Sequence, residues 1–374
     1  MSTAAGLTED ERDFDFPREV PVLTDGVVTL RAHELDDLDR IVEFAADPDT
    51  LRWTTIPHPY GRADARRFVF ETVPAGWRSR SDLRWAIEVD GHFAGNVDLR
   101  LDGPRAGIGF GLHPAARDRG VMRRAVEMVA RHAFEVLGVR VVEWRAFEGN
   151  LGSLRVAHAC GFTLQARIRD GLSWHEQLRD AWVGTLRPEH LGSPQSTWRA
   201  TTFSTERFRL RPLVEADDPR IRETLDDPIS RRYLFGRPDP LTLADAGAER
   251  TRKWWTAACG ETCTWAVADK DTDRYLGDIS IFGIDDVTGA EAGFYTHPDA
   301  RGSGVLREAF GAVVPHCFGE LGLRRLTMFA ADSNAGSKAL ACAAGFRVIG
   351  VQESAARTGG VFEDLVGYEL LADR

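Results

Sequence analysis

Two short stretches of the sequence have the residue types of an anion-binding turn. Residues 301–305 read RGSGV and residues 117–121 read RDRGV, and each precedes an apolar-periodic run typical of a helix. The first amides of a helix have no internal acceptors and lie at the positive end of the helix dipole. Glycines let an anion approach those amides closely, which suits a pyrophosphate. The spacing is not that of a P-loop. For either stretch alone, a glycine turn that only packs is the alternative interpretation.

An asparagine and a serine follow each turn at the same distance. Asn334 and Ser337 belong to NAGS, Asn150 and Ser153 belong to NLGS, and each group precedes a helix that ends at Gly-Phe. These residue types cap helices in many proteins, so capping alone is one interpretation. Capping does not explain why the turn and the asparagine recur together, and this recurrence favours a shared site.

These coincidences belong to a duplication that spans the chain. VVTLRAHELDD at 27–37 matches RFRLRPLVEAD at 207–217, 180 residues later, whereas Asn150 and Asn334 are 184 residues apart. A nearly constant offset of this size predicts two copies of one domain rather than a solenoid. We predict an acidic flexible tail over residues 1–25 and an N-terminal domain over residues 26–186. A linker rich in Ser, Thr and Pro follows over residues 187–204, and a C-terminal domain over residues 205–374.

The order of elements within each copy predicts a mixed, mostly antiparallel sheet flanked by helices, hence the α/β class. Short strands and an acidic, partly helical stretch come first, and strands, a long helix, a strand, a helix and two strands follow. Pro315 falls inside the long helix of the second copy. It predicts a kink or a break there, because an interior proline costs about 3 kcal/mol.

Composition narrows the function classes. A chain of 374 residues with 43% apolar residues can form two ordinary domains, and its net charge of −10 argues against a broad nucleic-acid interface. The absence of a long apolar run predicts no membrane span, and the acidic N-terminal stretch lacks the apolar core of a signal peptide. Five scattered cysteines fit a reducing cytoplasm. CGETC at 259–263 has no matching second pair, so we predict no metal site.

Both copies resemble the GNAT superfamily of N-acyltransferases, and closely its ribosomal-protein-alanine N-acetyltransferase (Rim-type) branch. The resemblance rests on GFGLHPAARDRGVM…FEGNLGSLRVAHACGF and GFYTHPDARGSGVL…ADSNAGSKALACAAGF, and it covers nearly all of 26–186 and 205–372. It implies two tandem GNAT-like domains and a cytoplasmic N-acetyltransferase that uses acetyl-CoA as co-substrate and acts directly on a primary amine.

The resemblance also implies where acetyl-CoA binds. In this family the R-x-x-G turn cradles the pyrophosphate, the strand before it splays from its neighbour and hydrogen-bonds the pantetheine arm, and the helix after the asparagine lines the other side. The residues carried over are Arg301, Gly302, Ser303, Gly304, Val305 and Asn334 in the second copy, and Arg117, Arg119, Gly120, Val121 and Asn150 in the first.

Two departures from the family pattern concern these turns. Met122 and Leu306 stand where the family usually has a small residue, which leaves less room against the phosphates. The first copy also has Asp118 where the second has Gly302, and a carboxylate beside a pyrophosphate repels it.

The resemblance makes the two copies unequal in chemistry. Side chains alternate along a strand, so Glu291 shares a face with Gly293 and Tyr295, and the first copy has Gly107 at the position of Glu291. Many superfamily members place a general-base glutamate on this strand, and the Rim-type branch is thought to use the serine three residues after the asparagine. We therefore expect the second copy to carry catalysis, with Glu291 as base and Ser337 as proton donor. A solvated strand-edge charge is the alternative for Glu291.

Several alternatives stay open at this point. The glycine face of the first copy is too bare to supply a base, so that copy is a weaker enzyme, a cofactor-binding regulator or a scaffold. His113 and His297 are expected to fix the strand-to-turn junction rather than take part in chemistry. The acceptor is a peptide N-terminus or a small-molecule amine such as a metabolite or antibiotic, or both copies are degenerate acyl-CoA sensors. The chain is a monomer with pseudo-dimeric halves or a homodimer.

Overall fold

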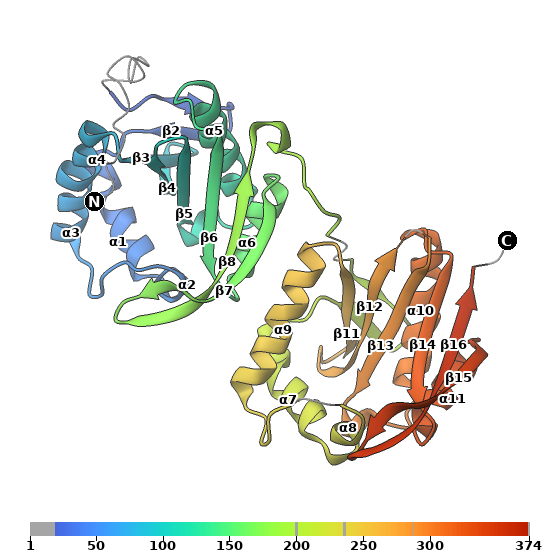
Figure 1. Ribbon diagram of the computed structural model, residues 1–374. Coiled ribbons are helices and arrows are strands. Elements are labelled where there is room, and N and C mark those ends of the chain that lie inside the picture. The colour runs from blue at the N-terminus through green and yellow to red at the C-terminus, as the bar shows by residue number, and fades with distance from the viewer. Residues whose placement is uncertain (1–18, 199–200, 235–236, 286, 373–374) are drawn as a thin grey trace, which may run out of the picture. The chain divides into compact units, whose positions relative to one another are not determined.

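The computed structural model describes residues 19–198, 201–234, 237–285 and 287–372. The chain divides into two compact units, Met1–Ser196 and Thr197–Arg374. Each unit is an eight-stranded sheet flanked by helices (Figure 1), which confirms the predicted fold class and the duplication. Of the predicted tail, residues 1–18 lie outside the described residues. The remainder contributes strand β1 to the first sheet.

The first unit orders its strands β1-β2-β3-β4-β5-β6-β8-β7, and β5–β6 is its parallel pair. The other neighbouring strands are antiparallel. In chain order its elements are β1 (Leu23–Thr24), β2 (Thr29–Arg31), α1 (Leu38–Ala46), α2 (Pro48–Trp53), α3 (Arg62–Arg67), α4 (Val73–Ser79), β3 (Asp82–Val89), β4 (His92–Asp102), β5 (Arg105–Leu112), α5 (Val121–Glu135), β6 (Val141–Phe147), α6 (Leu151–Ala159), β7 (Thr163–Trp174) and β8 (Gln177–Leu186).

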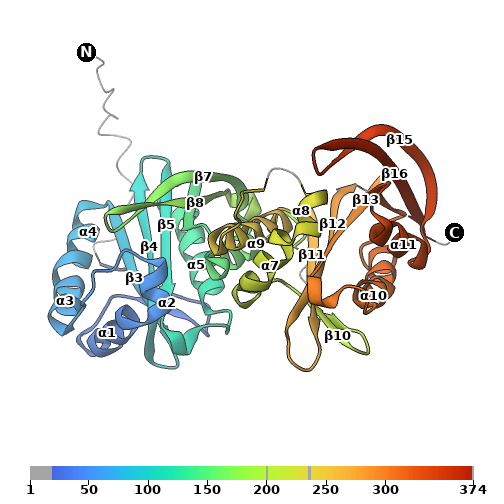
Figure 2. The same cartoon turned by 90° about the horizontal axis from the view of Figure 1, so that it is seen from below.

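The second unit repeats this topology, with strand order β15-β16-β14-β13-β12-β11-β10-β9 and a parallel pair β13–β14. The long β15–β16 hairpin, which contains two register shifts, is strongly curved (Figure 2). The elements are β9 (Phe203–Ser204), β10 (Phe208–Arg211), α7 (Asp218–Asp226), α8 (Pro228–Tyr233), α9 (Leu243–Ala258), β11 (Thr262–Asp269), β12 (Tyr275–Asp285), β13 (Gly289–Thr296), α10 (Val305–Gly319), β14 (Arg325–Ala331), α11 (Ala335–Ala343), β15 (Arg347–Thr358) and β16 (Val361–Leu371).

Helices cover both faces of the sheet of the second unit, because the side chains of its central strands are apolar on both faces. On β11, Trp265 and Val267 pack into the core that contains α10, whereas Ala266 packs into a separate core with residues of α7 and α9. Alternation along the strand sends neighbouring side chains to opposite faces. Burial of each large apolar side chain contributes about 1.5–3 kcal/mol, so the helices are held on both sides of the strands that form the site.

Helix α10 runs from Val305 to Gly319 with Pro315 inside it. The predicted break is therefore wrong. Val313 and Cys317, on either side of the proline, are fully buried in the core. Their burial offsets the cost of the missing hydrogen bond and holds the helix together.

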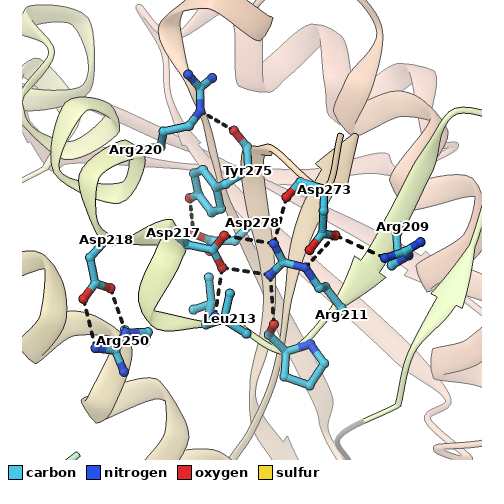
Figure 3. A network of polar contacts seen from close by, with 12 residues as sticks. Arg209, Arg211, Leu213, Asp217, Asp218, Arg220, Arg250, Asp273, Tyr275 and Asp278 are labelled. Atoms are coloured by element: carbon cyan, nitrogen blue, oxygen red, sulfur yellow. Dashed lines mark hydrogen bonds and ion pairs between the residues drawn. The ribbon is translucent and has the colours of Figure 1, made fainter. Parts of the chain in front are cut away.

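A buried ion pair fixes the first helix of the second unit to its sheet (Figure 3). Arg211 of β10 donates from Nη1 and Nη2 to both oxygens of Asp217, at 2.8 and 2.9 Å, and Asp217 is the N-cap residue of α7. Arg31 and Asp37 repeat the pair at the same two distances in the first unit. A bidentate pair of this kind sets orientation as well as distance. It places the helical cover consistently against the sheet in both units.

Candidate active site

The two arginine–glycine turns have the same backbone in both units. Asp118 and Gly302 lie in the left-handed region, with φ of 58° and 74°. Gly120 and Gly304, the N-cap residues of α5 and α10, have φ of 71° and 79°. Aspartate tolerates this region better than most side chains, so the first unit keeps the turn without its glycine. A Cβ added to the N-cap Gly120 would meet no described neighbouring atom within 4 Å, and one added to the N-cap Gly304 would meet Arg207 Nη2 at 3.6 Å. The helix start is therefore open in the first unit and lies beside a guanidinium in the second, and both arrangements suit an anion.

The leading arginine of each turn is bound to a protein carboxylate. Arg301 Nη2 donates to Asp227 Oδ2 at 2.7 Å, and Arg117 Nη2 donates to Asp47. These aspartates are the N-cap residues of α8 and α2. Burial opposes ionisation of Asp227, but the hydrogen bond and the charge of Arg301, together with hydrogen bonds from the backbone of residues 229 and 230, outweigh it and hold the pKa below its ordinary value. The guanidinium thus fastens the turn to the neighbouring helix. Arg119 is exposed and pairs with a carboxylate of the β3–β4 turn.

The residues that follow each turn point into the core. Val121 and Val305 begin their helices and are buried, and so are Met122 and Leu306. The larger side chains at the last two positions therefore fill the core instead of crowding the turn. Ser303 Oγ donates to a carbonyl of the preceding 3-10 segment at 2.7 Å and closes the turn.

The strand before each turn separates from its parallel neighbour. In the described chain β13 pairs with β14 through two residue pairs, the last being Glu291 with Thr327, although β13 continues to Thr296. In the first unit the pairing of β5 with β6 ends at Ile108, and β5 continues to Leu112. The separated segments leave backbone donors and acceptors for another partner next to the turn. This is the splay that the family resemblance implies.

The asparagines of both motifs are helix N-caps. Asn334 Oδ1 accepts from the amide of Ser337 at 3.0 Å at the start of α11, and Asn150 Oδ1 accepts from the amide of Ser153 at 3.1 Å at the start of α6. The capping interpretation is therefore confirmed for both. Capping also fixes each serine in the first turn of its helix, where it lines a cavity.

The two serines differ in their hydroxyl contacts. Ser153 Oγ accepts from the indole Nε1 of Trp144 at 2.9 Å. The second unit has Met328 at that position of the sheet, and a thioether has no hydrogen to donate. Within the described chain the Ser337 hydroxyl therefore lacks the indole donor that Ser153 has.

A cavity of about 690 Å³ in the second unit brings the predicted catalytic residues together. Glu291, Asn334 and Ser337 all line it, with Gly293 and Tyr295 from the separated part of β13. The residues expected to act on the thioester and on the amine therefore share one space with the separated part of β13, whereas the turn residues 301–305 are not among those that line it.

Glu291 lies in this cavity in an apolar environment. Its cross-strand partner on β12 is Phe282, whose ring would be 2.9 Å from a Cβ added to Gly293. Burial raises the pKa of Glu291. Glu249 lines the same cavity but behaves oppositely: ion pairs with arginines overcome the effect of burial and lower its pKa to about 2. Of these two carboxylates, Glu291 is the one suited to take up a proton.

The two histidines hold the junction between strand and turn, as expected. His297 Nε2 lies 2.9 Å from Glu223 Oε2. The Nδ1 of His297 accepts from the amide of Asp299, so His297 caps the following 3-10 segment. His113 Nε2 lies 3.2 Å from Glu43 Oε2 in the first unit.

A second cavity, of about 670 Å³, lies at the corresponding place in the first unit. Asn150, Ser153 and the glycines of β5 line it. So does Asp98 of β4, which is in register with Gly109. The glycines of β5 themselves carry no base, but the neighbouring strand places a carboxylate in the same cavity. The period-two pattern of residues 92–102, paired with β5, is the signal that would have found it.

The part of the chain that the structure describes contains neither a cluster of metal-ligating side chains nor a membrane-spanning helix. No three His, Cys, Asp or Glu side chains within it gather as a metal site requires. None of the helices in the same ranges is long and apolar enough to cross a membrane.

Comparison with known proteins places both units in one group. The family model of the acetyltransferase (GNAT) domain matches residues 28–163 and 207–347. "Putative ribosomal N-acetyltransferase YdaF" of Bacillus subtilis (strain 168) is 32% identical over 154 residues, which are 39% of this chain and 82% of that protein. "Probable N-acetyltransferase YjcK" of the same strain is 32% identical over 96 residues, which are 25% of this chain and 52% of that protein. RimJ of Mycobacterium smegmatis, solved in complex with CoA-disulfide, has 20% identity and a TM-score of 0.41, over 45% of this chain and 86% of that one.

Proposed function

The chain belongs to the acetyltransferase (GNAT) family through both of its halves and is an N-acetyltransferase, and from this premise we propose that its C-terminal half transfers acetyl from acetyl-CoA to a primary amine. The observation that carries the proposal is the cavity that joins Glu291, Asn334 and Ser337 with the separated part of β13.

The glycine turn and the separated strand are suited to hold acetyl-CoA. The amides of Gly302 to Leu306 lie at the start of α10, where negative charge is favoured, and so are suited to the pyrophosphate. Arg301 positions the turn through Asp227. The backbone of β13 beyond Glu291 has the donors and acceptors that an amide-containing arm needs.

Glu291 supports the proposal because its carboxylate is half-buried next to Phe282 and has a raised pKa. An α-amine titrates at about 7.7–8.0 and needs to lose only one proton to become a nucleophile. A carboxylate of raised pKa takes that proton, directly or through a water, more readily than an ordinary glutamate does.

Ser337 is suited to the other proton transfer. Acetyl-CoA supplies a thioester whose sulfur leaves as a thiolate, and a hydroxyl within reach protonates it. The Ser337 amide is held by Asn334, so the hydroxyl has a fixed place in the first turn of α11. Ser337 and Glu291 line the same cavity.

A peptide α-amine is the acceptor we propose. The name of YdaF refers to ribosomal acetylation, and the matched region covers most of that protein. A lysine amine, with a pKa near 10.4, asks more of a carboxylate base.

The test is release of free thiol from acetyl-CoA by the full chain, with peptides that begin with alanine or serine as acceptors. Intact-mass analysis then locates the added acetyl group. Acetylation at the α-amine supports the proposal. Peptides blocked at the N-terminus are the control, and release that is equal with free and blocked peptides contradicts it. Acetylation of spermidine or an aminoglycoside, with none of the peptides, would assign the site to small-molecule amines.

A further inference from the structure

A row of three residues crosses the sheet of the first unit under its cavity. Arg84 of β3 is in register with Asp98 of β4, and Asp98 is in register with Gly109 of β5. Arg84, Asp98 and Gly109 all line the cavity. The second unit has a neutral row at this place, in which a Thr264–Ser280 hydroxyl pair at 3.0 Å lies next to Gly293.

The Asp98 side chain lies over Gly109. A Cβ added to that glycine would be 2.5 Å from Asp98 Oδ2, so only a glycine leaves the carboxylate its place. The Asp98 side chain is 18% exposed, and Oδ1 has no hydrogen-bond donor among the described residues. The ion pair that this oxygen makes with Arg100 lacks hydrogen-bond geometry, so the oxygen keeps its capacity to accept a proton.

The charges around Asp98 do not neutralise it fully. Arg100 Nη1 lies 3.4 Å from Asp98 Oδ1 on the exposed side, and Arg84 is drawn to Asp82 by an ion pair. Burial raises the pKa of Asp98, and these two arginines only partly oppose it. Glu143 also lines the cavity, but two other arginines pair with it at 2.8 and 2.6 Å. Asp98 is thus the carboxylate of this cavity that resembles Glu291 in its environment.

The two units have exchanged the position of their carboxylate. Gly107 of the first unit stands where the second has Glu291, and Arg100 fills the space above it, 3.5 Å from an added Cβ. Ser280 of the second unit stands where the first has Asp98. Each cavity therefore holds one carboxylate whose pKa is raised by burial beside the separated strand, and it comes from β4 in the first unit and from β13 in the second.

We propose that the N-terminal half is a second acetyl-transfer site, with Asp98 as its general base. Asp98 takes a proton from the acceptor ammonium and later releases it to solvent. The free amine forms the C–N bond to the acetyl carbon as the C–S bond of acetyl-CoA breaks. The Ser153 hydroxyl, whose oxygen accepts from Trp144, gives its proton to the departing sulfur, which leaves as a thiol. The second amine proton passes through solvent to the Ser153 oxygen and restores the hydroxyl. The products are an N-acetyl amine and CoA.

The lining of this cavity identifies the acceptor as an amine that carries an apolar group. Trp53, Ile56, Tyr60 and Phe68 form one wall. The second cavity also has aromatic lining residues, among them Phe294, Tyr295 and Phe329, but its α9 side adds Glu249, Arg252 and Lys253. The two halves therefore take different acceptors. This inference uses the reaction of the family but does not depend on Glu291.

The experiment measures acetylation of 2-phenylethylamine, tryptamine and phenylalanine amide by the full chain, from thiol release and product mass. We expect Asp98→Asn to lower turnover by about 10²-fold or more, the range for a general base, while Glu291→Gln leaves it unchanged. Asp102→Asn, at the exposed end of the same strand, is the matched control. Asp98→Ser, which installs the residue of the second unit, serves where the asparagine variant fails to fold, as shown by its thermal unfolding.

The outcomes separate the two proposals. Turnover of these amines that survives in both Asp98 variants, or that is lost in Glu291→Gln, overturns the second site. A wild-type chain that acetylates none of the three amines overturns it as well. Peptide acetylation that is lost in Glu291→Gln and kept in Asp98→Asn supports the C-terminal site whatever happens at the first. Loss of all thiol release in the wild-type chain contradicts both.

Discussion

Replacing Glu291 with glutamine removes a proton acceptor while keeping the shape of the side chain. The carboxylate is half-buried beside Phe282, and in the described chain it has no ion pair that the substitution would break. The loss is therefore that of general-base catalysis. We expect kcat for the peptide acceptor to fall by about 10²–10⁴-fold, or about 3–5 kcal/mol in the barrier.

The same substitution has an opposite effect on stability. Burial raises the pKa of Glu291 above its ordinary value of 4.5, so the folded state favours its protonated form. That contribution is present below the ordinary pKa and is lost as the pH rises through the raised one. At neutral pH the ionised carboxylate costs stability that a neutral amide does not. Glu291→Gln should therefore unfold at the same temperature as the wild type or at a higher one.

The assay is the initial rate of thiol release at saturating acetyl-CoA, measured across acidic and neutral pH together with thermal unfolding. Wild-type activity should fall as the pH falls through the raised pKa, because the base must be ionised to act. Glu206→Gln, at an exposed glutamate, is the control. A variant that keeps its rate within twofold of the wild type refutes the reasoning, and so does one that loses its rate only because it is less stable.

Three further predictions concern the turn and the serine. Ser337→Ala should lower kcat for the peptide by about 10²-fold with little change in KM. Ser204→Ala, at an exposed serine, is the control. A change in KM alone would contradict a role of Ser337 in proton transfer. Arg301→Ala should lower the free energy of unfolding of the second unit by about 1.5–3 kcal/mol at neutral pH, because it leaves the Asp227 carboxylate without its cationic partner. Since the pKa of Asp227 is lowered in the folded state, the difference in free energy of unfolding between variant and wild type should vanish as the pH falls through that lowered pKa. A difference that does not depend on pH would exclude the ion pair as the cause of the destabilisation. Gly304→Ala, at φ 79°, should lower the free energy of unfolding by about 1–2 kcal/mol and weaken CoA binding. Gly311→Ala, on the exposed face of α10, should raise the free energy of unfolding by about 0.5–1 kcal/mol and leave CoA binding unchanged. Equal effects of the two substitutions would argue against a strained turn.

Local sequence was sufficient for the features that depend on neighbouring residues. The duplication followed from the nearly constant offset, and the turn at Gly304 followed from glycines placed between a strand and an apolar-periodic run. The capping role of Asn334 is equally local, since its acceptor bond spans three residues.

Features that depend on distant residues could not be predicted in the same way. Arg301 pairs with Asp227, which lies 74 residues earlier in the chain, and nothing in RGSGV indicates that partner. Asp98 reaches over Gly109 only because β4 and β5 pair in a particular register. Pro315 remains helical because tertiary burial outweighs its local cost.

The central claim is that each half holds an anion-binding turn and a separated strand that together take one acetyl-CoA. Isothermal titration of the full chain with CoA, without any acceptor, tests it most directly. We expect two molecules of CoA bound per chain, and one when Gly304 is replaced with a residue that closes the turn. A stoichiometry of one for the wild-type chain would contradict the duplicated site, and no binding would contradict the account as a whole.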